Sequence, residues 1–421
     1  MMHVAVTQNK KPHHSNDALN SNLGKLIDPD PPTARNIREE MRFFPNYLQP
    51  ILTWVTGKPL EDEQPIIKLT PWLYLIFAII AVAFPGIMTM YLLDLGGIWL
   101  CFVPLLWIIQ VGGARTIQVT ILHHCVHYNF SANKTIDRWI AEIASTILVI
   151  QDFSGYQFDH VSIHHSKKLA TIEDPDLRFL ITLGFLPSMS KKDLWINLYK
   201  TILSPRFHFL FFRARISANY KSSKGYRRMM FWVYLATLII VIYWFSSPSG
   251  LIKFTFGWFI PLTIIYHIAA LLQFVCEHKW LNVSDKKGRL KLARLTSGRF
   301  MGEAIPISSV DKTKQLYKWI KWGAKMLFIH IPFRIFVMVG DLPAHDWHHR
   351  HPKDHDWTIA SYARQQDLNL GCPGWPEIYS EVWGLSNAIE SVFNVLSSLD
   401  PINEDYDELT QEEKFDTIIG M

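Results

Sequence analysis

The distribution of charge along the chain leaves four long apolar stretches. No Asp, Glu, Lys or Arg occurs in residues 69–93, 95–114, 229–252 and 254–276. A helix needs about 20 apolar residues to cross roughly 30 Å of hydrocarbon, and each stretch is at least that long. The pattern therefore predicts four transmembrane helices, at about 71–93, 97–117, 230–248 and 254–276.

Short turns are expected to join these helices into two hairpins. Asp94 is the only charge between the first two helices, and SSPSG at 246–250 lies between the other two. The polar region between the hairpins, 121–228, holds 15 Lys and Arg against 8 Asp and Glu. Because basic loops stay on the cytoplasmic side, we expect this region, the region from 277 onward and both termini in the cytoplasm. The expected location is a bacterial inner membrane or the endoplasmic reticulum, with a multi-pass topology.

Two weaker apolar stretches, 139–151 and 326–340, are too short to span a membrane comfortably. We expect helices there that lie at the interface or pack on the cytosolic part, which leaves four crossings before residue 345. Residues 312–325 carry five lysines with Trp319 and Trp322 among them, as in an amphipathic helix on a membrane surface. A solvated charged helix is the alternative for that segment.

Composition divides the chain into a polar N-terminal segment (1–68), a membrane domain (69–395) and an acidic C-terminal tail (396–421), which we expect to be solvated. No apolar run follows a basic start, so the first membrane helix would act as its own insertion signal. The four cysteines form no CxxC pair and are expected to be free thiols. No HExxH, P-loop or glycine-rich dinucleotide motif occurs, which argues against a zinc protease and a nucleotide cofactor. No nucleic-acid partner is expected.

Histidine is concentrated in three short segments that adjoin the predicted membrane helices. Residues three or four apart share one face of a helix, so the histidines within each segment should converge. Two histidines four apart are common and more often structural than metal-bound, but three such clusters on one side of a membrane are hard to explain by chance. Imidazole is a good ligand of Zn, Cu, Fe and Ni. The converging residues are His123 and His127, His160 and His164 with His165 beside them, and His345, His348 and His349.

The number of clustered histidines indicates two metals. A tetrahedral zinc site needs four ligands, so eight converging histidines suffice for two ions. His278, at the end of the fourth apolar stretch, is a ninth candidate, with an unligated interfacial histidine as the equal alternative. Metal-bound imidazoles usually donate to an outer acceptor. Four acids lie near enough in sequence to accept, although each is more often a surface or capping residue: Asp159, Asp174, Asp341 and Asp346.

The order HxxxH, HxxxHH and HxxHH, with two membrane hairpins interleaved, resembles the membrane fatty acid desaturase superfamily over roughly residues 70–380. The resemblance implies an all-α integral membrane fold, with a cytosolic helical cap that holds a di-iron site. HHSKKLATIEDPD, HDWHHRHP and the Glu277–His278 pair are similar to alkane monooxygenases, whereas HHCVHYNF is similar to the first desaturase box. His124 stands where an acid often follows the first histidine, and it is left out of the ligand set. The implied iron ligands are His123, His127, His160, His164, His165, His345, His348 and His349, with His278 as the ninth.

The superfamily implies an oxidoreductase that uses O2 and external electrons to attack an unactivated C–H bond of a long-chain acyl lipid or hydrocarbon. Fatty acyl desaturation is favoured, with hydroxylation as the alternative. The chain shows no cytochrome b5-like or Cys-rich electron-transfer motif, so a separate donor of the ferredoxin, rubredoxin or cytochrome b5 type is expected. A membrane metal receptor or transporter is the alternative of another class. A receptor would need about four ligands, and a transporter would need ionisable residues within its spans, where only His267 qualifies.

Overall fold

The computed structural model describes residues 36–171, 173–222, 224–244, 247–280, 288–306 and 311–401. The tail histidines His3, His13 and His14, and the acidic tail from residue 402, lie outside these ranges. The described chain is mostly helical, which confirms the predicted class. Its two short strands, β1 (Gly298–Phe300) and β2 (Glu381–Trp383), pair in parallel with Gly298 opposite Glu381.

Four helices in the described part of the chain are long and apolar enough to cross a membrane, as predicted. Two of them are composite, because π-helical turns interrupt the α-helix. They are α4 (Pro71–Leu95); the span Gly97–Val126, made of a 3-10 turn, α5 (Val103–Thr116), a π-helical stretch (Ile117–Leu122) and α6 (His123–Val126); α12 (Gly225–Trp244); and the span Pro248–Glu277, made of α13 (Pro248–Phe254), two π-helical stretches (Thr255–Phe259, Pro261–Ile265) and α14 (Tyr266–Glu277).

The fourth span begins earlier in the structure than the charge pattern predicts. Ser247 caps the helix by accepting from the Gly250 N–H, and a proline follows at the first helical position. Proline suits that position because its missing N–H would have no helical partner. Lys253, the charge that delays the predicted start, lies inside the helix and pairs with Asp94 at 2.6 Å. A single lysine with a nearby acid therefore does not end this span.

Three of the four spans pack closely because small residues line their contacts. A Cβ on Gly113 would meet the Ala78 carbonyl oxygen at 2.8 Å, so α5 approaches α4 directly. Gly257 faces Gly86 in the same way, and the Gln110 side chain donates to the Gly257 carbonyl at 2.9 Å. Small residues at helix contacts are how membrane helices gain van der Waals packing. The α4, α5 and α13–α14 helices thus form the inner part of the membrane bundle.

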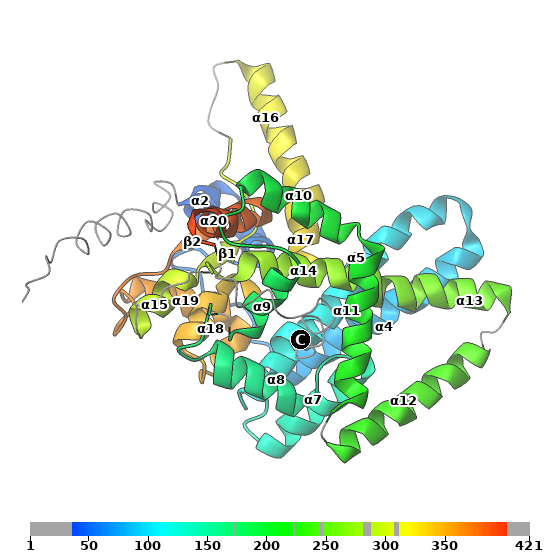
Figure 1. The fold of residues 1–421 in the computed structure, drawn as a ribbon. Helices are drawn as coiled ribbons and strands as arrows, with labels where there is room; N and C mark the ends of the chain where they lie inside the picture. Colours follow the sequence, from blue (N-terminus) through cyan, green and yellow to red (C-terminus); the bar gives the residue numbers. More distant parts are fainter. Residues whose placement is uncertain are drawn as a thin grey trace, which may run out of the picture.

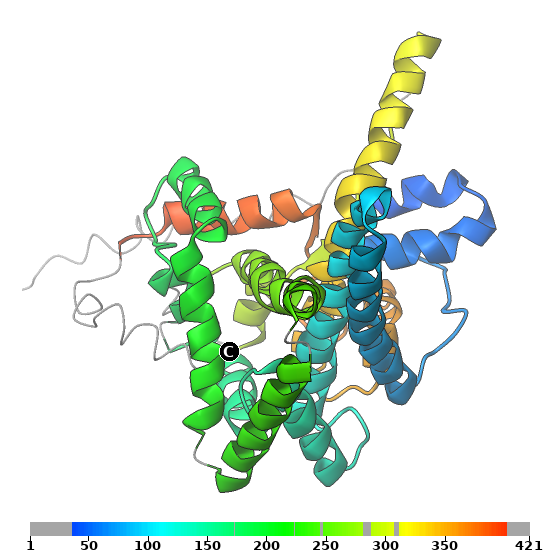
Figure 2. The ribbon, with the colours of Figure 1, turned by 90° about the vertical axis from the view of Figure 1, so that its right-hand side faces the viewer.

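The third span, α12, stands apart from this bundle. Figures 1 and 2 show that α12 and α13 diverge, so that α12 runs apart from the fourth span. Only Arg227 and Phe231 of α12 are buried. The Arg227 guanidinium pairs with Glu142 of α7 (Lys134–Leu148) at 3.2 Å and also donates to the Asn219 and Ser145 side chains. One end of α12 is therefore anchored, while most of its length has little protein around it.

The remaining helices lie around the spans, and α18 (His345–Arg350), which carries three of the histidines, is among them (Figure 1). Part of the predicted polar N-terminal segment belongs to this folded body, since Arg38 is fully buried and donates to Lys58 and Gln49. The stretch 326–340 does not form a fifth candidate span. These α-helices are α2 (Ile37–Glu40), α3 (Gln49–Thr56), α7, α8 (Phe153–Gln157), α9 (Pro175–Thr182), α10 (Lys191–Ile202), α11 (Pro205–Tyr220), α15 (Arg289–Leu295), α16 (Lys312–Lys325), α17 (Ile331–Phe336), α18, α19 (Ala360–Asn369) and α20 (Leu385–Ser398).

Candidate metal centre

The nine histidines singled out from the sequence lie in two adjacent groups. Within each group one ring nitrogen of every histidine lies within 4.8 Å of those of the others. Rings of the two groups are in contact, since those of His165 and His349 stack at 4.4 Å. The five-histidine group is His123, His127, His160, His165 and His348, and the four-histidine group is His164, His278, His345 and His349.

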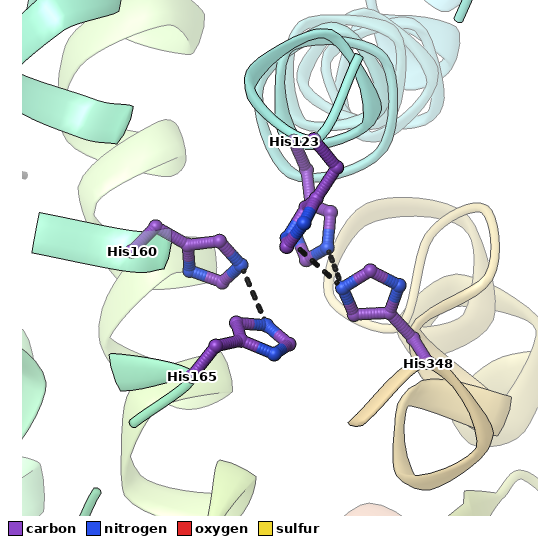
Figure 3. Close-up of side chains that lie close together, drawn as sticks. His123, His160, His165 and His348 are labelled. Carbon is purple, nitrogen blue, oxygen red and sulfur yellow. Dashed lines mark hydrogen bonds between the residues drawn. The ribbon is translucent and has the colours of Figure 1, made fainter. Parts of the chain in front are cut away.

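The five-histidine group draws its members from three parts of the chain. The Nε2 atom of His348 lies 2.7 Å from Nε2 of His123 and 3.2 Å from Nε2 of His127. Nε2 of His160 lies 3.0 Å from Nε2 of His165. Figure 3 shows the labelled rings pointing into one common space from separate segments. Their nitrogens thus converge although the helices that carry them are distant in sequence.

The four-histidine group assembles around the end of the fourth span. Nε2 of His164 lies 2.9 Å from Nε2 of His278, the residue directly after α14. His345 and His349, one turn apart on α18, place their rings 4.7 Å apart. His278 is therefore a member of the four-histidine group.

Local helix geometry decides which histidine joins which group. On an α-helix, His160 would pair with His164. Residues Phe158–His164 are π-helical, and the His165 N–H donates to the His160 carbonyl five residues back. The π turn pairs His160 with His165 and directs His164 to the other group. Such turns are frequent at functional sites. On α18 the three histidine rings lie within 6.2 Å of one another, and this one helix contributes His348 to one group and His345 and His349 to the other.

The histidine rings have the properties that metal ligands need. Burial, with neighbouring imidazoles as the next cause, lowers the pKa of His160, His165, His348 and His349 well below its usual range, and that of His127 to about 3. Their rings are then neutral, which is the form that binds metals. Two nitrogens held by one metal at about 2.1 Å and a right angle lie about 3 Å apart. The observed separations of 2.7 to 3.2 Å fit that geometry.

Carboxylates approach the four-histidine group at two points. Nδ1 of His164 faces Asp174 at 3.3 Å and Asp176 at 3.2 Å, so its Nε2 is left for the group. Burial lowers the pKa of His164, but these two carboxylates outweigh burial and raise it to about 9. Glu277 lies 3.4 Å from Nε2 of His345. Among the described residues, no carboxylate contacts a member of the five-histidine group.

Only one of the four acids proposed from the sequence contacts a member of either group. Asp174 does so, through His164. Asp159 accepts from Gln151, and Asp346 pairs with Arg364 at 2.9 Å. Asp341 contacts His124, which lies outside both groups with its ring stacked on Trp357. Asp176 was missed, although its place two residues after Asp174 in the DPD sequence was a usable signal.

A small cavity adjoins both groups. Its volume is about 70 Å³, and its wall includes His123, His160, His164 and His345 together with apolar side chains. Gln118 and Gln273 line it as well, and the buried Arg115 donates to both of them. Gln273 in turn donates to Glu277 at 3.0 Å. A hydrogen-bonded chain thus leads from Arg115 inside the membrane bundle to Glu277 beside His345.

These features define a helical membrane protein with two buried histidine groups that could each hold a metal ion. Residues 97–302 match the model of the fatty acid desaturase family. This match covers just under half of the chain; it confirms the resemblance to the membrane desaturase superfamily and supports a desaturase or oxygenase type of function. The third histidine box lies beyond the matched residues, yet the structure brings it to the first two. No significant match was found among curated proteins or solved structures.

Proposed function

We propose that the chain is an O2-dependent di-iron oxidoreductase that attacks an unactivated C–H bond of a long-chain lipid, most simply as a fatty acyl desaturase. The observation that carries this proposal is the convergence of nine imidazoles in two adjacent groups, six of them within the residues that match the desaturase family model. Imidazole suits iron as a ligand. Nine ligands exceed the four of one structural zinc site, which argues against a metal receptor.

In this proposal each histidine group holds one iron, and the bound metals supply the chemistry that activates O2 for C–H cleavage. The protein supplies the positions. Burial keeps water from the rings, and α18 couples both groups because it contributes His348 to one and His345 and His349 to the other. Asp174 and Asp176 fix the His164 ring with its Nδ1 toward them, so that Nε2 faces the group.

The proposed path of the lipid chain begins at an apolar cavity of about 570 Å³ between α4, α11, α12 and α14. Such a cavity, with few polar groups, suits a hydrocarbon chain. The exposed position of α12 leaves access from the bilayer. Tyr266 lines this cavity and donates to Gln118, which lines the smaller cavity beside the histidines. We propose that the chain passes Tyr266 to reach the metals.

The proposed topology places the histidine groups and both termini in the cytoplasm, where a separate electron carrier of the ferredoxin, rubredoxin or cytochrome b5 type would dock. The excess of basic residues in 121–228 supports this orientation. Hydroxylation of an alkane or acyl chain is the second candidate reaction, favoured by the Glu277–His278 pair and by the sequence around the second and third histidine boxes. Which reaction follows depends on how the chain lies against the metals.

The decisive experiment is mass spectrometry of lipids from a bacterial host that expresses the chain, with His348→Ala as the inactive variant and His351→Ala as the matched control. His351 belongs to the same box but contacts Asp367 and lies outside both groups. A product lacking two hydrogens identifies a desaturase, and a product gaining one oxygen identifies a hydroxylase. Metal analysis should give about two irons per chain. One zinc and no lipid product would contradict the proposal.

A further inference from the structure

Helix α16 extends away from the body of the protein. None of its residues from Lys312 to Lys325 is buried. Figures 1 and 2 show that it runs across the direction of the span formed by α13 and α14, so that it points sideways from the membrane bundle. The helix has 14 residues, and most of its surface is not covered by the rest of the protein.

The base of α16 is attached to the membrane bundle. The chain continues from it through a π-helical stretch, Met326–His330, into α17. A Cβ on Gly112, in the middle of the second span, would meet the Ile335 carbonyl oxygen at 2.3 Å, so α17 packs directly on α5. Because α17 is held at the level of a span while α16 runs transverse to the spans, α16 is placed along the membrane plane rather than through it.

One face of α16 packs on the protein. Trp319 and Trp322 contact the rings of Phe43 and Phe44, with the Trp322 and Phe44 rings stacked at 5.7 Å. The Trp322 indole N–H donates to the Glu303 carbonyl at 3.1 Å. These contacts fix the rotation of the helix about its axis, and therefore determine where its other two faces point.

A second face of α16 is apolar and exposed. Leu316, Tyr317 and Ile320 are each more than 60% exposed, and Phe328 in the following turn is 73% exposed. Leu316 and Tyr317 precede Ile320 by four and three residues, which places these three on one side of α16. Phe328 is exposed beyond them, in the π-helical stretch. Among the described residues no other element covers this face. Exposed apolar side chains grouped in this way mark a membrane or protein contact.

A third face of α16 carries lysines spaced by four, three and four residues: Lys314, Lys318, Lys321 and Lys325. The two end lysines have acidic neighbours, with Lys314 3.8 Å from Asp311 and Lys325 2.6 Å from Glu303. Within the ranges that the structure describes, Lys318 and Lys321 have no acidic partner. Lysine stems can lie along apolar surface while their ammonium groups reach the headgroup layer.

We propose that α16 is an in-plane membrane anchor, which inserts its Leu316–Tyr317–Ile320 face into the bilayer and binds anionic lipid headgroups with its lysine face. A lipid bilayer fits three features of the helix: its direction across the spans, its attachment to a span through α17, and its adjacent apolar and basic faces. The inference rests on the membrane location of the spans and not on the proposed reaction. Its failure is therefore distinguishable from a failure of the proposed function.

The test measures the depth of residue 320 in the full-length protein reconstituted in lipid nanodiscs. The background carries Cys101→Ser, because Cys101 is the exposed member of the four cysteines. A nitroxide is attached to Ile320→Cys and its accessibility is measured to O2, which dissolves in lipid, and to an aqueous nickel chelate. Labels at Ile80→Cys in α4 and at Lys353→Cys in the loop after α18 provide the lipid-exposed and water-exposed references. The anchor predicts that residue 320 behaves like residue 80.

The lysine face is tested by comparing phosphatidylcholine nanodiscs with nanodiscs that also contain phosphatidylglycerol. Anionic lipid should increase the membrane-bound population of the helix by about five-fold for each lysine at the surface, and Lys318→Gln with Lys321→Gln should abolish that share of the increase. The matched control replaces two exposed lysines of α10, Lys192→Gln with Lys200→Gln, and should keep the full response.

Three results would overturn the proposal. The first is a label at residue 320 that is as open to the nickel chelate as the label at 353 in both lipid mixtures. The second is protection that appears only at a high protein-to-lipid ratio, which would make a second copy of the chain the occupant. The third is protection that requires an added acidic electron carrier, which would make the face a protein-docking surface.

Discussion

The two histidine groups differ in what surrounds them. The five-histidine group is enclosed by other imidazoles and apolar residues, and no carboxylate of the described chain contacts it. The four-histidine group has Asp174 and Asp176 against His164, and Glu277 beside His345. The two proposed metal positions, built from the same residue type, therefore lie in unequal electrostatic surroundings.

This difference matters because neutral imidazoles do not cancel the charge of bound metal ions. Acids next to a ligand compensate that charge, orient the ring and raise the basicity of the bound nitrogen. All such acids stand at the four-histidine group. A proton-bearing Nδ1 on His164 faces carboxylates, which is also why the pKa of this histidine alone is raised, to about 9, whereas that of His349 is lowered. We expect the two metals to respond differently to substitution.

The largest effects should come from removing one ligand of each group. His348→Ala deletes the residue that contacts His123 and His127, and His349→Ala deletes a member of the other group. Each substitution should lower metal affinity at its own group by more than about 100-fold, since the loss of an outer partner alone costs 10–100-fold. Turnover should be lost in both variants, and each should retain about half of the iron.

Iron content by mass spectrometry of the purified variants is the measurement, with His351→Ala as the full-occupancy control. If both variants lose all iron together, the two groups form one indivisible site. If both retain all of it, the assignment of these histidines as ligands is wrong. Either result would remove the basis for comparing the groups.

The next largest effect should come from removing the charge of the carboxylates beside the four-histidine group. Asp174→Asn with Asp176→Asn keeps the shape of both side chains but removes their charge from His164. The affinity of this group for iron should fall 10–100-fold, while the five-histidine group keeps its metal. Timed removal of iron by a chelator measures both populations, and two phases should appear in the variant. Equal weakening of both groups would show that the acids act on the centre as a whole.

The sequence identified the residues of this centre but not their division. Spacing and composition were enough to select His123, His278 and His345 as candidates, because clustering beside predicted spans is visible in one dimension. The split between groups depends on the π turn at 158–164 and on the direction of α18. An α-helical period places His160 with His164, whereas the π turn places it with His165. No local feature of the sequence indicates the change from an α-helical to a π-helical period.

The parts of the fold that depend on hydrophobicity could be predicted from the sequence. The parts that depend on pairing between distant side chains could not. The four spans could be predicted from the lengths of the charge-free stretches. A helix in a membrane must satisfy its backbone hydrogen-bonding groups within a single apolar segment. The early start of the fourth span depends on the Lys253–Asp94 pair, and the place of α12 depends on the Arg227–Glu142 pair. Asp341 was expected near a ligand and instead contacts His124. Partners distant in sequence cannot be read from spacing.

A smaller effect is expected for Glu277. Glu277→Gln keeps the side-chain length and the contact with Gln273, but it removes the negative charge 3.4 Å from His345. The affinity of the four-histidine group for iron should fall by about ten-fold, the lower end of the range for an outer partner. The chelator assay again separates the groups. Gln273→Glu, which adds a charge one helical turn away, is the opposite variant. If the rate of iron removal is unchanged in Glu277→Gln, only the carboxylates beside His164 affect the affinity for iron.

The smallest effect on the metals is expected at His124, which lies beside the five-histidine group without joining it. His124→Phe should keep the stacking on Trp357 but deprive the buried Asp341 of a partner at 2.9 Å. The free energy of unfolding should fall by at least about 1–3 kcal/mol, the usual cost of leaving a buried acceptor without its hydrogen bond, which is larger for a charged group. His124→Gln, which can still donate to Asp341, should lose less. Thermal unfolding measures both variants, and iron content should remain full because no ring of either group is removed. Loss of one iron in His124→Phe would instead show that His124 is a ligand. It would then have to be counted with the five-histidine group.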